Sequence, residues 1–530
     1  MTHGFRAVLW LMTALALGSC TYMKHVVDQS QRTEQQRADP SLKNLKHLLD
    51  AKTQYVYGRI LDPEGKFKRA AVAVAGYANA YGTTELVDLM GVASVGTHYG
   101  LTLPCTEDTT YRLVVLTDAD GNGQFDPHEV IGQRLIEPSQ LTRDGGVLRN
   151  LDIVLSTRKA APIPGPVQVP APPPIERSVF YPAGAIRTLE DPLFDPDIAV
   201  LGMYEPAAFT EQAPMMFYAL EEDVGYRIPV ILVHGLSGTP RQFQPLIDRL
   251  DRKRFKPWFF YYPSGTDLAQ VAELFYGIFL SGDAVGKNPR IPTVIVAHSM
   301  GGVVVREALN RLAEPTHQEI RFISIASPLG GHPSAAAGEK RAPMIVPSWR
   351  SLNPDGEFIG RLYRRPLPAT VTYQLLYTYR DEGVRTGANS DGVVPLHSQL
   401  RAEAQQEATL QRGFDATHVG VLSDPAALDF LMQEIHATQT QFPPDHMRWL
   451  LKGGYAVRDE SPYGPQLTHL IQTMGQYLWA VGSEQIPALD AEQRHFVEAI
   501  KGRTPPTNDV ERGWLAFVAR HPELAGADPR

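Results

Sequence analysis

The chain carries an alcohol, a carboxylate and an imidazole in that order, each in a setting that suits nucleophilic catalysis. Ser299 lies between an apolar, strand-like run at 293–297 and a helical run at 302–312. A sharp turn between a strand and a helix exposes a serine hydroxyl, and small neighbouring residues fit such a strained turn. Asp391 follows in a turn-rich loop, and His418 comes later still. We therefore expect these three side chains to meet at one point.

The three residue types have complementary roles in acyl transfer. A serine hydroxyl is a weak nucleophile until a base removes its proton. His418 would act as that base, and later as the acid that protonates the leaving group. Asp391 would hold the imidazole in one tautomer and stabilise the imidazolium. The tetrahedral intermediate carries an oxyanion, which needs preorganised N–H donors.

Other residues compete for the acid and base roles. Asp381 and Glu382 are the alternatives for the acid. His397 lies too close after the acid to return on a separate loop, and His332 precedes the acid. We therefore prefer His418 as the base.

Residues from about 225 to 437 resemble the α/β-hydrolase superfamily, and within it the bacterial lipases and esterases. The chain order of Ser, Asp and His is the order of that superfamily's triad. Ala297 stands where the usual elbow has its first glycine. The matching pieces are 233–235, 297–302, 326–331, 391–395 and 417–419.

The resemblance implies a mostly parallel sheet with helices on both faces, which the alternation of strand-like and helical runs in this region also favours. It assigns the oxyanion donors to the backbone N–H groups of Leu236 and Met300. We expect His234 to order the oxyanion loop and His298 to be a packing residue within the elbow. Residues 328–368 interrupt the alternation and could form a cap over the serine.

Residues 1–19 are expected to be a signal peptide that is not part of the fold. Arg6 gives a positive start, and residues 7–17 are apolar but too short to span a bilayer comfortably. Two small residues then precede Cys20, an ending that resembles a bacterial lipobox, after which the cysteine is lipidated. The resemblance implies a lipid-anchored protein of the cell envelope. Because Thr21 and not Asp follows, it implies the outer membrane, facing the periplasm, in a Gram-negative cell.

Short β-rich runs separated by turn residues between 53 and 157 suggest a small β-sandwich domain. Within it, oxygen-bearing side chains fall at positions one, three, five, seven, nine and twelve of a loop that has Gly123 at position six. That spacing is typical of a calcium loop, here flanked by strand and not by helix. We expect a structural calcium ion bound by Asp118, Asp120, Asn122, Gln124, Asp126 and Glu129.

Length and composition suggest the remaining organisation. A chain of 530 residues suggests several domains, and 43% hydrophobic residues suffice for their cores. The net charge of −8 and the lack of a basic run give no indication of nucleic-acid binding. With two cysteines, one of them Cys20, no internal disulfide is expected. We expect a signal peptide at 1–19, a tether at 20–52 and the β-domain at 53–157. A proline-rich spacer at 158–175, the catalytic domain at 176–440 and a helical extension at 441–530 would follow.

These features predict an envelope-anchored serine hydrolase that cleaves carboxylic esters through an acyl-enzyme. The lipase-like motifs and the membrane anchor favour lipid acyl esters as substrates. No cofactor is expected for catalysis. An acyltransferase or thioesterase with the same triad is the alternative enzyme. A non-catalytic envelope scaffold is the alternative from a different class, and the presence of all three triad residue types argues against it.

Overall fold

The computed structural model of the chain describes most of its residues. Asp381 and Glu382, the alternative acids, lie outside the described ranges, as do residues 170–175 of the expected spacer. The described chain forms two units, one of Met1–Glu221 with Pro229–Thr438 and one of Glu222–Ile228 with Gln439–Arg530. The described residues are 3–39, 46–49, 51–67, 72–80, 82–92, 98–105, 109–141, 146–158, 160–169, 185–214, 216–222, 225–282, 284–285, 287–313, 318–380, 389–457 and 463–522.

The larger unit contains an eight-stranded sheet with the strand order β16-β15-β14-β13-β11-β12-β10-β9. The pairs β11–β13, β13–β14, β14–β15 and β15–β16 are parallel, whereas β10 is antiparallel to β12 and parallel to β9. This mostly parallel sheet confirms the α/β class that the alternating pattern predicts. The strands are β9 (Ala185–Ile186), β10 (Phe217–Ala219), β11 (Ile228–Val233), β12 (Phe255–Phe260), β13 (Thr293–His298), β14 (Ile320–Ile325), β15 (Val371–Thr378) and β16 (Leu410–Phe414).

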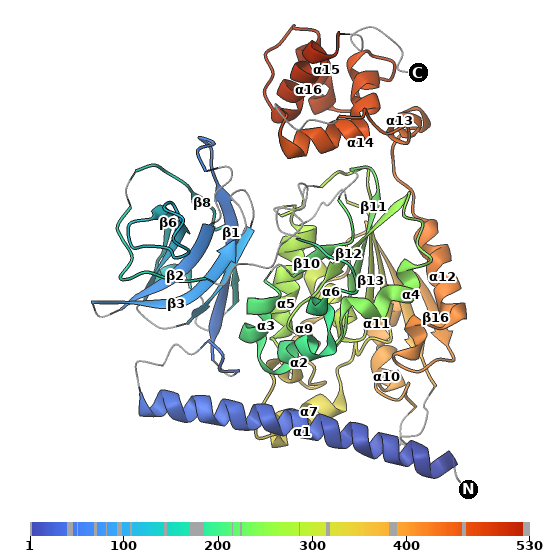
Figure 1. Cartoon of the computed structure of the whole chain (residues 1–530). Coiled ribbons are helices and arrows are strands. Elements are labelled where there is room, and N and C mark those ends of the chain that lie inside the picture. The colour runs from blue at the N-terminus through green and yellow to red at the C-terminus, as the bar shows by residue number, and fades with distance from the viewer. Residues whose placement is uncertain are drawn as a thin grey trace. The chain divides into compact units, whose positions relative to one another are not determined.

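Helices cover both faces of this sheet (Figure 1). Helices α5 and α6 pack together on one face, and α4 and α12 pack together on the other. Three short helices, α7, α8 and α9, lie in the region expected to form a cap. The helices of this part are α2 (Pro196–Tyr204), α3 (Pro206–Gln212), α4 (Gln244–Ile247), α5 (Leu268–Phe275), α6 (Met300–Leu309), α7 (Pro333–Arg341), α8 (Pro347–Ser351), α9 (Glu357–Arg361), α10 (Leu396–Gln399), α11 (Ala402–Glu407) and α12 (Pro425–His436).

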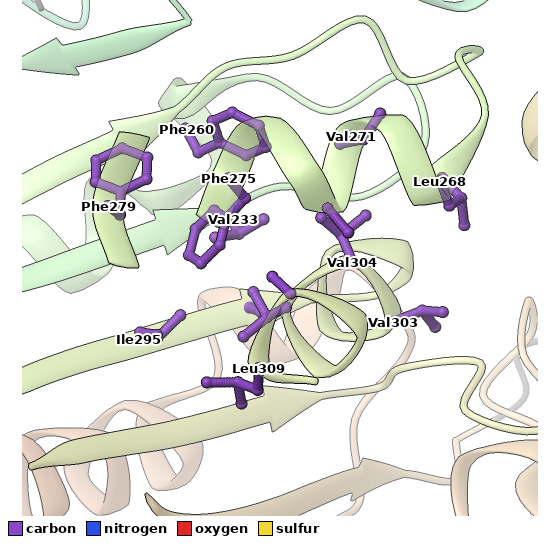
Figure 2. Packing of buried hydrophobic residues seen from close by; sticks show 14 of the residues in the cluster. Val233, Phe260, Leu268, Val271, Phe275, Phe279, Ile295, Val303, Val304 and Leu309 are labelled. Carbon is purple, nitrogen blue, oxygen red and sulfur yellow. The ribbon is translucent and has the colours of Figure 1, made fainter. Parts of the chain in front are cut away.

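The largest apolar core lies between the sheet and the helix pair α5–α6. Every residue of β11 and β13 is buried, as their continuous apolar sequences require of central parallel strands. Val233 and Ile295 from these strands meet Phe275 of α5 and Val304 of α6 (Figure 2). Burying each such side chain contributes about 1.5–3 kcal/mol. The core therefore makes a rigid support for the loops that leave the strand ends.

The N-terminal β-domain consists of two four-stranded sheets, one with β1, β4, β7 and β8 and the other in the order β3-β2-β5-β6. Buried apolar side chains from both sheets form one shared core between them. The strands are β1 (Thr53–Leu61), β2 (Val72–Ala80), β3 (Thr83–Val92), β4 (His98–Pro104), β5 (Thr110–Thr117), β6 (Val130–Ile136), β7 (Gly146–Leu148) and β8 (Ile153–Val154).

Part of the expected proline-rich spacer belongs to this β-domain. Phe125 and Val167 exchange two backbone hydrogen bonds of 2.9 and 3.0 Å. Ile163 is buried in a second apolar cluster together with side chains of β2 and β5. The guanidinium of Arg112 also donates to the carbonyl of Pro162 at 3.1 Å. Residues 160–169 therefore do not form a free polyproline spacer, because their apolar side chains cover one face of a sheet.

Helix α1 (His3–Ala38) includes the first part of the expected tether and packs on the larger unit. The Tyr22 hydroxyl donates to the carbonyl of Met344 at 3.1 Å and accepts from its N–H at 3.2 Å. His25 Nδ1 lies 2.8 Å from a carboxylate oxygen of Glu205. The first part of the tether expected at 20–52 is thus helical, and Tyr22 and His25 dock that helix on the larger unit. Of the helices within the described residues, none combines the length and hydropathy that a bilayer crossing needs.

The smaller unit is a set of helices with its own apolar core. Trp514 and Phe517 of the last helix pack with Trp449, and Tyr226 from the short segment before β11 joins the same cluster. The helices are α13 (Pro444–Leu450), α14 (Gly464–Gly482), α15 (Ala491–Ile500) and α16 (Asp509–Arg520).

Candidate active site

Ser299 occupies a strained turn between β13 and α6. Its φ of 55° and ψ of −131° are values that residues other than glycine rarely adopt. A Cβ atom on Gly301 would lie 2.6 Å from the carbonyl oxygen of Val233, and one on Gly302 would lie 2.1 Å from Oγ of Ser327. Only glycine fits at these two positions, so the elbow packs directly on the neighbouring strand ends.

The structure brings Ser299, His418 and Asp391 into one hydrogen-bonded series. His418 Nε2 lies 2.9 Å from Ser299 Oγ, and His418 Nδ1 lies 2.8 Å from Asp391 Oδ2. All three side chains are buried, Asp391 most completely. Because an ionised carboxylate can only accept, Nδ1 carries the proton and Nε2 is left to accept from the serine hydroxyl. This is the tautomer in which an imidazole can act as a base towards serine.

Asp391 is held as a carboxylate by donors on both of its oxygens. Oδ1 accepts from the backbone N–H groups of Val393 and Val394 at 3.0 and 2.7 Å. Oδ2 accepts from Thr378 Oγ1 at 2.7 Å and Gln399 Nε2 at 3.1 Å, in addition to the imidazole. Burial by itself would raise the pKa of Asp391. The hydrogen bonds and the nearby imidazole outweigh it and hold that pKa below its usual value.

Thr378 and Gln399 were not identified from the sequence. Thr378 is the last residue of β15 and Gln399 the last of α10, so both approach Asp391 from elements other than its own loop. Neither residue type is unusual in such a position. No sequence signal could therefore have distinguished them from other polar residues at the ends of elements.

His234 stabilises the loop that carries the expected oxyanion donor Leu236. The backbone N–H of Tyr262 donates to His234 Nε2 at 3.2 Å, so His234 Nδ1 carries the proton and donates to the carbonyl of Gly235 at 2.7 Å. Burial lowers the pKa of His234 to about 4. In a trans peptide the carbonyl and the following N–H point in opposite directions. The hydrogen bond to Gly235 therefore fixes the direction of the Leu236 N–H.

The loop that carries the expected donor Leu236 lies directly against Ser299. A Cβ atom on Gly235 would lie 2.7 Å from Ser299 Cβ and 3.1 Å from Ser299 Oγ. Met300 is the first residue of α6, so its N–H has no acceptor within that helix. Gly235, the neighbour of the expected donor Leu236, and the expected donor Met300 therefore both adjoin the serine.

His298, expected to pack within the elbow, also makes a specific hydrogen bond. Its Nε2 lies 2.8 Å from the backbone carbonyl oxygen of His418. Burial, followed by the neighbouring His418, lowers the pKa of His298 to about 3, so the ring is neutral. Of the competing histidines, His332 Nε2 lies 2.7 Å from the carbonyl oxygen of Val393 in the Asp391 loop, and His397 is exposed on α10.

The loop expected to bind calcium connects β5 and β6. Carboxylate oxygens of Asp118, Asp120 and Glu129 lie within 4.8 Å of one another. Asn122 Oδ1 accepts from the Gln124 N–H at 2.8 Å. Asp126 approaches Asn122 Nδ2 at 3.1 Å, and its own N–H donates to Glu129 at 2.7 Å. The donor set is all oxygen, which suits a hard cation such as calcium.

Cys20, the expected lipidation site, lies within α1.

No protein-family model matches this sequence, and no curated protein matches it significantly. Solved structures with similarity include the mature lipase BlEst2 of Bacillus licheniformis, with 15% identity over 41% of this chain and 97% of that chain and a TM-score of 0.32. Lipase B of Aspergillus fumigatus has 19% identity over 52% of this chain and 68% of that chain, with a TM-score of 0.32. Phospholipase PlaB of Legionella pneumophila has 16% identity over 32% of this chain and 45% of that chain, with a TM-score of 0.26. Similarity this distant defines no activity, and the α/β architecture follows from the chain's own strands and helices.

Proposed function

We propose that this protein is a serine hydrolase of the α/β-hydrolase type that cleaves carboxylic esters through an acyl-enzyme. The observation that carries the proposal is the unbroken series of hydrogen bonds from Ser299 Oγ through the His418 ring to Asp391. The strained φ of Ser299 supports it, because such strain persists at sites where a function requires it.

In the proposed reaction, Ser299 Oγ attacks the ester carbonyl carbon while its proton moves to His418 Nε2. The electron pair of the carbonyl bond passes to the oxygen, and the backbone N–H groups of Leu236 and Met300 stabilise the resulting oxyanion. The intermediate collapses, the alkoxy group leaves with the proton from His418, and Ser299 is acylated. A water molecule then attacks the acyl carbonyl carbon while its proton moves to His418, and Ser299 leaves with that proton as the carboxylic acid is released.

Exposed apolar side chains next to the site support a lipid acyl ester as the substrate. Leu236, Val393 and Val419 are 39, 52 and 62% exposed. Each is an expected site residue or lies within two residues of one, Leu236 in the oxyanion loop and the valines after Asp391 and His418. Exposed apolar side chains at these positions are compatible with contact to an acyl chain or a lipid layer.

We propose in addition that Cys20 carries a lipid anchor and that the protein resides in the cell envelope, on the outer membrane and facing the periplasm in a Gram-negative cell. Tyr22 and His25 dock α1 on the larger unit within a few residues of Cys20. An anchor there would hold the catalytic unit close to the bilayer.

The oxygen ligands between β5 and β6 support a structural calcium ion with no part in catalysis.

A fluorophosphonate probe tests the central proposal, because it reacts only with an activated serine. Purified wild-type protein should be labelled and should hydrolyse aryl esters, whereas Ser299→Ala should do neither. A folded wild-type protein that resists the probe would favour the non-catalytic scaffold. A series of aryl esters of increasing chain length, beside phospholipids and triacylglycerols, would define the acyl group. Transfer of the acyl group to an added alcohol in preference to water would favour the acyltransferase.

A further inference from the structure

The catalytic imidazole proposed above is held at four points. Its ring bonds Ser299 through Nε2 and Asp391 through Nδ1. Its own backbone is bonded as well, because the N–H of His418 donates to the carbonyl of Asp391 at 3.0 Å and its carbonyl oxygen lies 2.8 Å from His298 Nε2. Asp391 thus supplies two of these contacts, and the elbow supplies the other two.

The two contacts from the elbow come from consecutive residues. His298 ends β13 and bonds the backbone of His418, while Ser299 follows it and faces the ring. The rings of His298 and His418 lie 4.8 Å apart between centroids. Because one strand end holds both the nucleophile and the backbone of its base, any shift of the His418 loop relative to Ser299 must break the His298 contact.

The hydrogen-bonding state of the His298 ring indicates that this hydrogen bond is the reason for a histidine at position 298. A carbonyl oxygen can only accept, so His298 Nε2 must carry the proton. His298 Nδ1 is buried and has no hydrogen-bond partner within the described part of the chain. Burying such an unpaired acceptor is unfavourable, and an apolar side chain of similar size would avoid it. The contribution that an apolar residue could not make is the donor on Nε2.

We propose that His298 is a positioning residue: by donating to the backbone carbonyl of His418, it holds the catalytic base at bonding distance from Ser299. The inference rests on the proposed serine hydrolase function. His298 does not touch the reacting atoms, and it stays neutral while His418 gains and loses a proton. A catalytic group displaced by about 1 Å can lose 10²-fold in rate.

A matched pair of variants separates positioning from packing. Glutamine places an N–H donor near the position of a histidine Nε2, whereas leucine fills similar space without a donor. We expect His298→Leu to lower kcat roughly 10–100-fold with KM within about twofold. His298→Gln should recover most of that loss. The melting temperatures show whether either variant is unfolded.

A second measurement does not depend on turnover. The Nδ1 proton of His418, bonded to Asp391, should give a resonance far downfield in the proton NMR spectrum of the wild type. We expect this signal to be lost or broadened in His298→Leu and kept in His298→Gln. The inference is overturned if His298→Leu keeps the wild-type kcat, or if the signal is the same in all three proteins.

The two proposals fail in distinguishable ways. If wild-type protein resists the fluorophosphonate probe, the hydrolase function is overturned, and the NMR comparison still decides whether His298 orients the His418 ring. If wild-type protein is labelled and His298→Leu is labelled at the same rate, only the role of His298 is refuted.

Discussion

Replacing Asp391 with asparagine should impose the wrong tautomer on His418. An asparagine offers one acceptor oxygen and one NH₂ donor where the aspartate offers two acceptors. The N–H groups of Val393 and Val394 face Oδ1 and cannot reverse their polarity, so the amide oxygen must take that place. The NH₂ group then faces the imidazole and the Thr378 hydroxyl, which can both become acceptors, and the hydrogen bond from Gln399 Nε2 is lost. Asp391→Asn therefore moves the imidazole proton to Nε2.

An imidazole protonated at Nε2 cannot accept the proton of Ser299. The expected loss in kcat is ~10⁴-fold, which corresponds to about 5 kcal/mol in the barrier. The assay is the steady-state hydrolysis of a short aryl ester at neutral pH, with Ser299→Ala as the background. Asp415→Asn makes the same chemical change at an exposed aspartate paired with Arg380, so it should keep wild-type activity.

A folded Asp391→Asn protein that loses less than tenfold in kcat would refute this reasoning. The orienting acid would then have to be sought among residues 381–388, which include Asp381 and Glu382. A fall of the same size in Asp415→Asn would show that the assay reports a general defect of the loop and not the tautomer.

Three further changes test the other parts of the site and the chain. Gly235→Ala places a methyl group 2.7 Å from Ser299 Cβ and should displace the oxyanion loop. We expect kcat to fall roughly 10²–10³-fold in the same ester assay. A loss below threefold would contradict the placement of this loop. Removing calcium with EGTA should lower the melting temperature of the β-domain by roughly 4–8 °C for each kcal/mol of binding free energy lost and leave esterase activity intact. Glu129→Gln should abolish that response, and equal melting of the wild type with and without EGTA would remove the calcium site. Cys20→Ala should move the protein from the membrane to the soluble fraction of cells with unchanged activity, and continued membrane association would argue against the lipid anchor.

The strand ends of the larger unit were predictable because several constraints coincide there. The run before Ser299 is continuously apolar, as a strand buried on both faces must be, and glycines follow where neighbouring backbone approaches closely. The run before His234 has the same character. Element type and the order of the site residues are therefore recorded locally in the sequence.

The contacts that complete the site have no such local record. Thr378 and Gln399 bond Asp391 only because β15 and α10 end beside its loop. His298 reaches a main-chain carbonyl, an acceptor that any residue at position 418 would offer. A hydrogen bond from a side chain to a backbone carbonyl restricts the residue type at the donor's position only, because every residue type at the other position offers the same carbonyl. From the sequence alone, such a residue is therefore predicted to be a packing residue.

The expected tether and spacer show the same limitation on a larger scale. Polar composition in the first favours a tether with some helix, and proline content in the second favours an extended spacer, when each segment is considered alone. The docking of α1 depends instead on Tyr22, whose hydroxyl finds both backbone groups of Met344. The β-domain likewise retains the segment around Ile163 because apolar side chains of its own sheet need cover. Whether such a segment is free or docked is decided by surfaces distant in sequence. With the proposed lipid anchor on Cys20, a docked α1 would hold the larger unit directly at the membrane.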